Sequence, residues 1–300
     1  MSDIKNVLLI GAGGNLGPAI LNEFLASPFN VSVLTRPDST STFPPSVNVI
    51  TSSYELDSLV SAFKGQDAVI SLVGTPGFSS QKLFVDAAIA AGVRRFIPSE
   101  YGTDTASAKV RSLMPIFDGK RAVVEYLQSA GEPKGLSWTA LIPGFFFDWG
   151  LKVGFLGFDI QGRKATIWDD GNAAFHTTTL SHIGKALVAL LSTPDRLAKT
   201  KNTYVYVKSA ETSQNEILAA LEKKTGAKWA VEKTSTEGVF PDVTERLLKG
   251  DFGAFAPGVL AITYGKEGLG RWEKVWNEEL GLGAEDVESV VAEVVDGKRP

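Results

Sequence analysis

Unbroken apolar runs alternate with amphipathic stretches through the first half of the chain. Residues 7–10 are apolar at every position, and residues 68–73 are apolar apart from one serine. Continuous apolar runs of this length are typical of strands that are buried on both faces of a parallel sheet. The pattern therefore predicts strands at 7–10, 31–35, 47–50, 68–73, 95–98 and 138–142.

Between these strands the apolar positions take the spacing of helices. A single apolar stripe runs along 57–63, a helix over 80–91 would end at Gly92, and one over 118–130 would end at Gly131. Glycine is favoured just after the last residue of a helix. Repeated strand–helix units of this length predict an α/β fold, a doubly wound parallel sheet of the Rossmann type with right-handed crossovers.

The alternation loosens after about residue 150. We expect strands at 164–168 and 204–207 and helices at 180–191, with Ser181 near its N-cap, and 213–224. Trp272 and Trp276 would share one face of a later helix, because they are four residues apart. The chain is expected to form a Rossmann domain at 1–150 and a smaller mixed α/β lobe at 151–300, interleaved with the first domain and not folding independently. This lobe would lie over the C-terminal edge of the sheet, where open α/β folds bind ligands.

Composition narrows the range of functions. The 300 residues carry a formal net charge of −4 without a basic cluster, which argues against a nucleic-acid surface. There is no cysteine, which excludes disulfides and thiolate chemistry, and the two histidines lack an acidic cluster, so no metal site is expected. No segment approaches the ~20 apolar residues of a membrane span. We therefore expect a soluble, cytoplasmic protein that acts on a small molecule.

A glycine-rich stretch directly follows the first strand. It precedes Pro18 and reads Gly11-Ala12-Gly13-Gly14-Asn15-Leu16-Gly17. Glycines let the backbone turn sharply and approach a ligand closely, and proline suits the first turn of a helix. The G-x-x-G-x-x-G spacing, at Gly11, Gly14 and Gly17, is typical of short-chain-reductase-like Rossmann domains. Strand, turn and helix N-terminus together predict a dinucleotide site that includes Gly13, Asn15 and Leu16, although a plain glycine turn has the same pattern.

Arg36, directly after the second strand, bears on the choice of cofactor. This position faces the adenosine ribose in a Rossmann fold, where an arginine pairs with the 2′-phosphate of NADP and an acid binds the 2′-hydroxyl of NAD. Arginine suits a phosphate because its fork is bidentate and always charged. Ser39 and Thr40 offer further hydroxyl groups, whereas Asp38 is an argument for NAD. We predict NADP, with NAD as the less favoured cofactor.

The usual Tyr-x-x-x-Lys pair of short-chain dehydrogenases is missing from its expected helix. The spacing occurs at Tyr204 and Lys208, but in a strand pattern that would separate the two residues by ~13 Å. The expected helix instead carries Lys120, with Ile116 at the tyrosine position. A lysine alone is therefore the candidate catalytic group.

Lys120 lies in F-D-G-K-R-A-V, and Pro98-Ser99-Glu100-Tyr101-Gly102 precedes it. Together with the glycine loop, these motifs resemble the NmrA-like and isoflavone-reductase-like proteins, which are atypical short-chain reductases. The stretch 143–151 is more similar to the fungal branch than to the plant enzymes, which reduce phenylpropanoid-type substrates with NADPH. The resemblance implies that Lys120 contacts the nicotinamide ribose and assists proton transfer at the substrate oxygen. Such a role requires a lowered lysine pKa; the alternative is a surface lysine or a ribose anchor.

Further cofactor contacts are expected around the ends of the strands. Gln81 opens the helix after the fourth strand and resembles a family contact, although a plain helix-start residue would look the same. The remaining candidates are in the turn after that strand and in the motifs after the fifth and sixth strands: Gly74, Thr75, Ser99, Pro143 and Phe145.

Aromatic residues crowd the stretch after the sixth strand. Those expected to line an apolar substrate pocket are Phe146, Phe147, Trp149 and Phe155. An interlobe core is the alternative for about half of them. Tyr101 would offer a hydroxyl group to the substrate or pack, and His176 would reach the same cleft or serve as a structural histidine.

Two functions fit these features best, and a flavin or sugar-nucleotide enzyme on the same fold is a weaker third. One is an NADPH-dependent oxidoreductase that reduces a small, largely apolar or aromatic carbonyl or enone compound. The other is an NmrA-type redox-sensing regulator, which binds NAD(P) and a protein partner without catalysis. Retention of Lys120 favours the enzyme, because a pure sensor needs no proton donor there.

Overall fold

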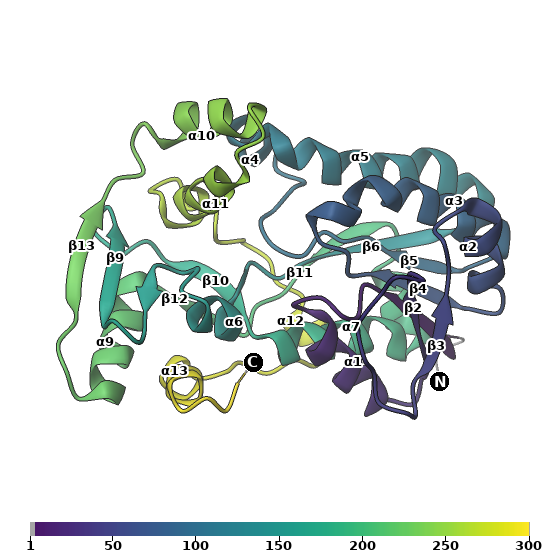
Figure 1. The fold of residues 1–300 in the computed structure, drawn as a ribbon, viewed down its shortest axis with the longest axis horizontal. Coiled ribbons are helices and arrows are strands. Elements are labelled where there is room, and N and C mark those ends of the chain that lie inside the picture. Colours follow the sequence, from purple (N-terminus) through teal and green to yellow (C-terminus); the bar gives the residue numbers. More distant parts are fainter. Residues whose placement is uncertain (1–3, 300) are drawn as a thin grey trace.

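The computed structural model describes residues 4–299, apart from the side chains of Thr75 and Pro76. Within this range, seven strands form a sheet in the order β11-β6-β5-β4-β1-β2-β3 (Figure 1). Every neighbouring pair in it is parallel, which confirms the Rossmann-type prediction. The strands are β1 (Asn6–Ile10), β2 (Asn30–Thr35), β3 (Asn48–Thr51), β4 (Ala68–Ser71), β5 (Arg95–Ile97), β6 (Ser137–Ile142) and β11 (Thr203–Tyr206).

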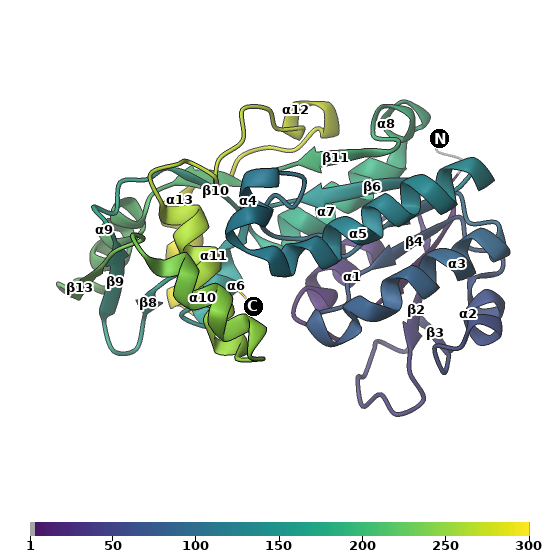
Figure 2. The ribbon, with the colours of Figure 1, turned by 90° about the horizontal axis from the view of Figure 1, so that it is seen from above.

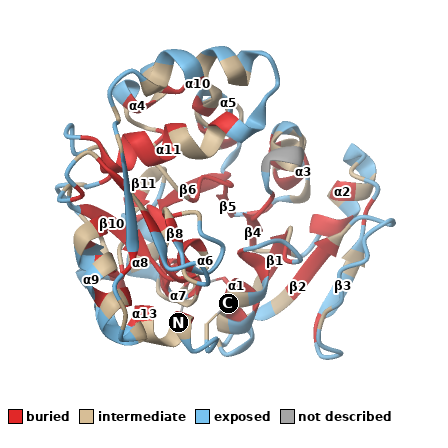
Figure 3. Cartoon of the chain, turned by 60° about the vertical axis from the view of Figure 1, so that its left-hand side comes forward, coloured by how far each residue is buried: buried red, intermediate tan, exposed pale blue. Residues whose placement is uncertain are grey.

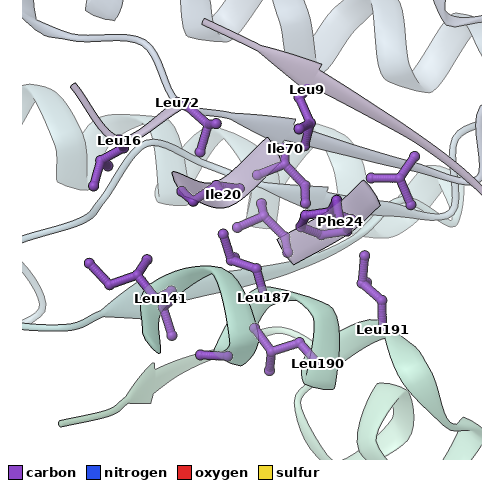
Figure 4. Packing of buried hydrophobic residues seen from close by; sticks show 14 of the residues in the cluster. Leu9, Leu16, Ile20, Phe24, Ile70, Leu72, Leu141, Leu187, Leu190 and Leu191 are labelled. Atoms are coloured by element: carbon purple, nitrogen blue, oxygen red, sulfur yellow. The ribbon is translucent and has the colours of Figure 1, made fainter. Parts of the chain in front are cut away.

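Helices cover both faces of this sheet. One face carries α1 (Gly17–Leu25) and α7 (Leu180–Ser192), and the other carries α2 (Leu56–Phe63), α3 (Gln81–Ala91) and α5 (Asp118–Tyr126). Successive strand residues point to opposite faces, so Leu9 packs with α1 and α7 while Leu8 packs with α2 and α3. Figure 4 shows the first of these cores, with Ile20 of α1 and Leu187 of α7 beneath the sheet.

The strand order reverses between β1 and β4, because the chain runs outward through β2 and β3 and then returns to β4. Ligands of open α/β sheets bind at this kind of switch point, beyond the carboxyl ends of the strands. The loops after β1, β4, β5 and β6 therefore define where a site is expected.

A second lobe lies beside the large sheet along the long axis of the molecule (Figure 2). In the described residues it contains two small sheets, ordered β12-β10-β7 and β13-β9-β8. Their strands are β7 (Phe145–Phe146), β8 (Phe158–Asp159), β9 (Lys164–Trp168), β10 (Phe175–Thr178), β12 (Ala210–Thr212) and β13 (Ala230–Thr234). The helices are α6 (Phe147–Lys152), α9 (Gln214–Thr225), α10 (Val239–Leu248), α11 (Phe255–Tyr264) and α13 (Val287–Val295).

Segments cross between the lobes in both directions. From the second half of the chain, β11 joins the large sheet and α7 packs on α1. From the first half, α4 (Ala108–Leu113) and η2 (Pro115–Phe117) place Val110, Met114 and Phe117 in the core of the second lobe. Figure 3 shows the buried residues of both lobes.

Two local expectations were wrong. The helix predicted to end at Gly131 becomes a π-helical turn, η3 (Leu127–Gly131), and then η4 (Glu132–Lys134), so the left-handed glycine is Gly135 (φ +86°). Pro133 explains the change, because it cannot continue an α-helix. The expectation that Ser181 lies near the N-cap of α7 is confirmed: the N-cap is Thr179, two residues earlier, whose hydroxyl group accepts from the His182 amide.

Trp272 and Trp276 do not lie on a helix. The Trp272 ring packs against the rings of His176 and Tyr206, with centroids 5.1 and 5.4 Å away. The Trp276 amide donates to the Tyr206 main-chain oxygen at 2.8 Å. Contacts between lobes, and not helical periodicity, thus determine this segment.

Short elements complete the fold: η1 (Thr75–Ser80), α8 (Pro194–Lys199), η5 (Phe252–Ala254) and α12 (Asn277–Leu280). Over residues 4–299, no helix combines the length and the apolar character needed to cross a membrane.

Candidate functional site

The glycine loop after β1 has two glycines that the fold itself requires. Gly11 has a φ of +84°, and a Cβ there would lie 3.0 Å from the Leu72 carbonyl carbon. A Cβ on Gly17 would lie 1.9 Å from the Ala12 oxygen. Both residues are therefore explained by the tight turn into α1.

Gly14 has no such explanation. It is exposed, its φ is not positive, and a Cβ there would meet only the Gly11 oxygen, at 3.4 Å. In the described residues the amides of Asn15 and Leu16 donate no hydrogen bond, and they precede the N-terminus of α1. An open backbone with free amides at a helix N-terminus fits a pyrophosphate that approaches the loop closely.

The segment after β2 lies against this loop. A Cβ on Gly13 would meet the Ser41 hydroxyl oxygen at 2.1 Å, so the two segments are in contact. Arg36 is exposed, and its Nε lies 3.5 Å from a carboxylate oxygen of Asp38, which is also exposed. An exposed ion pair of this kind is weak. The Arg36 guanidinium is thus available to a phosphate on the adenosine side of the loop.

Gln81 and Ser99 tie the ends of β4 and β5 together. The Gln81 side-chain oxygen accepts from the Ser99 amide at 2.8 Å, and the Ser99 hydroxyl group donates to the Val73 oxygen at 2.7 Å. Both side chains are buried. Gly74 is exposed beside them, whereas the side chain of Thr75, in η1, is outside the described structure.

Lys120 reaches from α5 to the end of β5. Its ammonium donates to the main-chain oxygen of Glu100, and Nζ lies 5.3 Å from the centre of the Phe78 ring. Burial lowers the pKa of Lys120, while the negative charge of Glu100 acts in the opposite direction. A lysine with a lowered pKa beside a strand end is suited to proton transfer.

Glu100 and Phe78 are the neighbours of Lys120 that sequence reasoning left without a role. Glu100 stands inside the P-S-E-Y-G motif, and its side chain is only 1% exposed. The sequence offered one indication of a role for Glu100: its carboxyl group stands between Ser99 and Tyr101, which were both candidate site residues. Phe78 follows the Gly74 turn and had no signal beyond its aromatic ring.

The aromatic residues after β6 divide into two groups. Phe146, Trp149 and Phe155 are partly exposed, and Trp149 lies 6.2 and 6.1 Å, ring centre to ring centre, from Phe146 and Phe155. Phe147 is completely buried in the core of the second lobe, and Phe145 packs edge-on against Phe175 and Tyr264 there. The first group offers an apolar surface, whereas the structure places Phe147 and Phe145 among core residues.

The loops after β5 and β6 are in contact. The Gly144 amide donates to the Gly102 oxygen at 3.2 Å. The Pro143 main-chain oxygen accepts from the Thr178 hydroxyl group of β10, and Pro143 is buried. The partly exposed aromatic residues therefore follow a loop that is joined to the one carrying Glu100.

Tyr101 and His176 are both buried. The Tyr101 ring belongs to the core around α1 and α7, and its hydroxyl group has no partner in the described residues. The His176 Nε2 lies 3.1 Å from the Glu211 carboxylate and 3.2 Å from the Lys208 ammonium. Its Nδ1 accepts from the Trp272 amide at 3.4 Å. Both ring nitrogens of His176 are thus engaged within the protein.

Comparison with known proteins agrees with this arrangement. The model of the NmrA-like family matches residues 3–256, and this covers most of the chain. The protein belongs to the NmrA-like family. The resemblance drawn from the glycine loop and the Lys120 motif is thereby confirmed.

Curated relatives extend to fungi and plants. "Oxidoreductase aprR" of Aspergillus flavus is 38% identical over 299 residues, covering 97% of this chain and 99% of the relative. "Isoflavone reductase homolog IRL" of Zea mays is 30% identical over 260 residues, covering 81% and 82%. Among solved structures, "AtPrR2 with NADP+ and (+)pinoresinol" has a TM-score of 0.79 at 22% identity and covers 98% of this NmrA-like chain and 100% of its own. That likeness shows the same fold.

Proposed function

We propose that this NmrA-like protein is an NADPH-dependent oxidoreductase that reduces a small, largely apolar or aromatic carbonyl or enone compound. The observation that carries the proposal is Lys120, whose ammonium is held at the end of β5 in surroundings that lower its pKa. Its aprR relative carries the name oxidoreductase, and that name agrees with the proposal. A cytoplasmic location remains a prediction.

The cofactor part of the proposal is based on the glycine loop and Arg36. The Asn15 and Leu16 amides would receive the pyrophosphate, and Arg36 would pair with the 2′-phosphate. Bound NADPH supplies a hydride. The fold neighbour with NADP+ in its name supports the same choice.

The substrate class is inferred from the surface after β6. Phe146, Trp149 and Phe155 offer aromatic faces, which favour an apolar or aromatic compound. Lys120 would give a proton to the substrate oxygen while the carbon receives the hydride. The plant relatives and neighbours carry the names of enzymes with aromatic substrates, as isoflavone and pinoresinol are.

Lys120→Met tests the catalytic role. We expect kcat to fall by about 10²- to 10⁴-fold, the range for loss of a general acid, with little change in the Kd for NADPH. The measurement is NADPH oxidation, followed by absorbance, over a panel of aromatic aldehydes, ketones and enones. Lys82→Met is the matched control, because the Lys82 ammonium also lies over a ring, 5.6 Å from the centre of Tyr126.

The outcomes separate the alternatives. Equal losses of NADPH affinity and kcat in Lys120→Met would make Lys120 a ribose anchor only. If the wild-type protein binds NADPH but oxidises it with no member of the panel, the oxidoreductase proposal fails, and a cofactor-sensing regulator with a protein partner becomes the better explanation.

Gly14→Ala tests the cofactor loop. Since the new Cβ meets only the Gly11 oxygen, at 3.4 Å, the melting temperature should stay within about 2 °C of wild type. NADPH affinity should fall at least about tenfold, because the methyl group occupies the phosphate approach. Calorimetric titration with NADPH measures this, and Gly283→Ala, which also adds a methyl group in open space, is the control. Unchanged affinity would remove the loop from the cofactor site.

A further inference from the structure

The Glu100 carboxyl group is buried without a full set of partners. Its side chain is 1% exposed, and Oε1 has no hydrogen-bond partner among the described residues. Leaving a buried carboxylate oxygen unpaired costs free energy, so the protein tolerates it only for a structural or functional reason. In the described structure no arginine or lysine forms an ion pair with Glu100. An ion pair therefore does not provide a structural reason for the buried carboxyl group.

Glu100 is joined to Lys120 on one side. The Lys120 ammonium donates to the main-chain oxygen of Glu100, so a rotation about the last bonds of the lysine side chain changes its distance from the carboxyl group of the same residue. The two groups also interact through their charges, and each favours the charged form of the other. Oε1 has no hydrogen-bond partner in the described residues, so it is free to hold the proton that is exchanged with Lys120.

On the other side, a chain of hydroxyl groups leads from Glu100 toward the surface. The Glu100 Oε2 accepts a hydrogen bond from the Thr105 hydroxyl group, and Thr105 lies close to the Tyr204 hydroxyl group. The Tyr204 hydroxyl group accepts from Arg121 at 3.4 Å, and both of these side chains are partly exposed. Hydroxyl groups both donate and accept, so this chain can pass a proton.

We propose that Glu100 exchanges protons with Lys120 and connects it to solvent through Thr105 and Tyr204. The inference rests on the proposed reductase function. When the carbonyl carbon accepts a hydride, the π electrons move to oxygen, a Lys120 N–H bond breaks and the O–H bond of the alcohol forms. The Glu100 carboxylate then gains a proton from solvent through the two hydroxyl groups, and the new O–H bond breaks as the Lys120 N–H bond is restored.

Other charged groups around Glu100 set the conditions for this exchange. Asp104 repels the Glu100 charge, and Arg121 attracts it. Asp104 accepts from the Tyr206 hydroxyl group at 3.1 Å, and Arg111 donates to the Thr105 main-chain oxygen at 2.6 Å. Burial raises the pKa of Glu100, so the neutral acid is accessible while Lys120 is an amine. The burial of Glu100 and the charges around it therefore favour the exchange of a proton between Glu100 and Lys120.

Glu100→Gln tests the coupling without a substrate. Competitive labelling with acetic anhydride, read by peptide mass spectrometry from pH 6 to 11, reports the pKa of Lys120 in the folded protein. Removal of the negative charge should lower that pKa by about one unit. Glu132→Gln is the matched control, since Glu132 is also a carboxylate that accepts a hydrogen bond, from the Trp138 indole at 2.8 Å, and should leave Lys120 unchanged.

Turnover tests the relay. In Glu100→Gln we expect kcat to fall at least about tenfold with unchanged NADPH affinity, and the alkaline limb of the pH–rate profile to move down with the labelling pKa. Thr105→Val keeps the carboxyl group and removes one hydroxyl group of the chain. It should leave the labelling pKa near wild type, lower kcat and increase the solvent deuterium isotope effect, and it serves as the second variant if Glu100→Gln does not fold.

Each result has one meaning. An unchanged Lys120 labelling profile in Glu100→Gln overturns the coupling, and a shifted profile with unchanged kcat overturns the relay. A wild-type protein that binds NADPH and turns over no panel member overturns the proposed function instead, while the labelling shift still establishes Glu100 as the group coupled to Lys120.

Discussion

At the scale of single residues, burial decides what the ionisable groups of this protein do. His176 and Lys120 were both candidate site residues. The structure gives His176 partners on both ring nitrogens, whereas Lys120 has a main-chain acceptor and an aromatic ring. Residue type alone did not separate a satisfied structural group from a group suited to proton transfer, because the difference depends on neighbours from distant segments.

The stability of the protein should depend on pH through His176. Burial and the nearby Lys208 charge lower the pKa of folded His176 to about 4, below its ordinary value of 6.5. The unfolded chain therefore binds more protons between these values, so stability is complete above 6.5 and is lost as pH falls toward 4. The free energy of unfolding should decrease by up to about 1.4 kcal/mol for each pH unit in that window.

Urea denaturation of wild type and His176→Gln between pH 5 and 7.5 measures this effect. The variant should be less stable at pH 7.5, because hydrogen bonds are lost, and its stability should depend less on pH. His182→Gln is run in parallel, since burial also lowers the pKa of His182. The same pH dependence in His176→Gln as in wild type would show that another group controls it.

At the scale of elements, local sequence rules succeeded where helix ends are determined by their own residues. The helix expected at 213–224 is α9, with Ser213 as N-cap, a complete capping box with Glu216, and Gly226 left-handed at its end. The rules failed at Gly131, where Pro133 two residues later redirected the chain. They also failed at Trp272, whose place is set by the rings of His176 on β10 and Tyr206 on β11.

Ser213→Ala tests the contribution of that capping box. The Ser213 hydroxyl group accepts from the Glu216 amide at 3.3 Å, and the Glu216 carboxylate accepts from the Ser213 amide at 2.9 Å. Loss of the hydroxyl group should destabilise the protein by about 1 kcal/mol. Chemical denaturation measures the change, with Ser61→Ala as control, because the Ser61 hydroxyl group bonds a carbonyl within α2 and should matter little. Equal effects of both variants would refute the capping role.

At the scale of the whole molecule, the two lobes are held together by exchanged segments. The sequence pattern predicts a boundary near residue 150 between two interleaved lobes. It does not say that β11 and α7 pack with the first half and that α4 packs with the second. The spacing of apolar residues indicates which face of a segment is buried. It does not indicate the hydrophobic core in which that face is buried. Sequence therefore predicted the strands and helices better than it predicted their partners.

Arg95 is a further example of what the pattern does not contain. It occupies an apolar strand run, yet it is a cation that is 3% exposed and, among the described residues, contacts only neutral oxygens. Its partners come from β6 and from Leu197 near the end of α8, where carbonyl groups favour a positive charge. Only the tertiary structure brings these oxygens around one guanidinium.

The Rossmann-type sheet, the glycine loop and the family follow from the sequence alone, because strand burial, backbone freedom and short motifs are properties of neighbouring residues. Only the three-dimensional structure shows that packing requires a glycine at positions 11 and 17 but not at Gly14. It alone also shows that Glu100 is buried beside Lys120. Those properties depend on distances between segments far apart in the chain, which neither composition nor periodicity encodes.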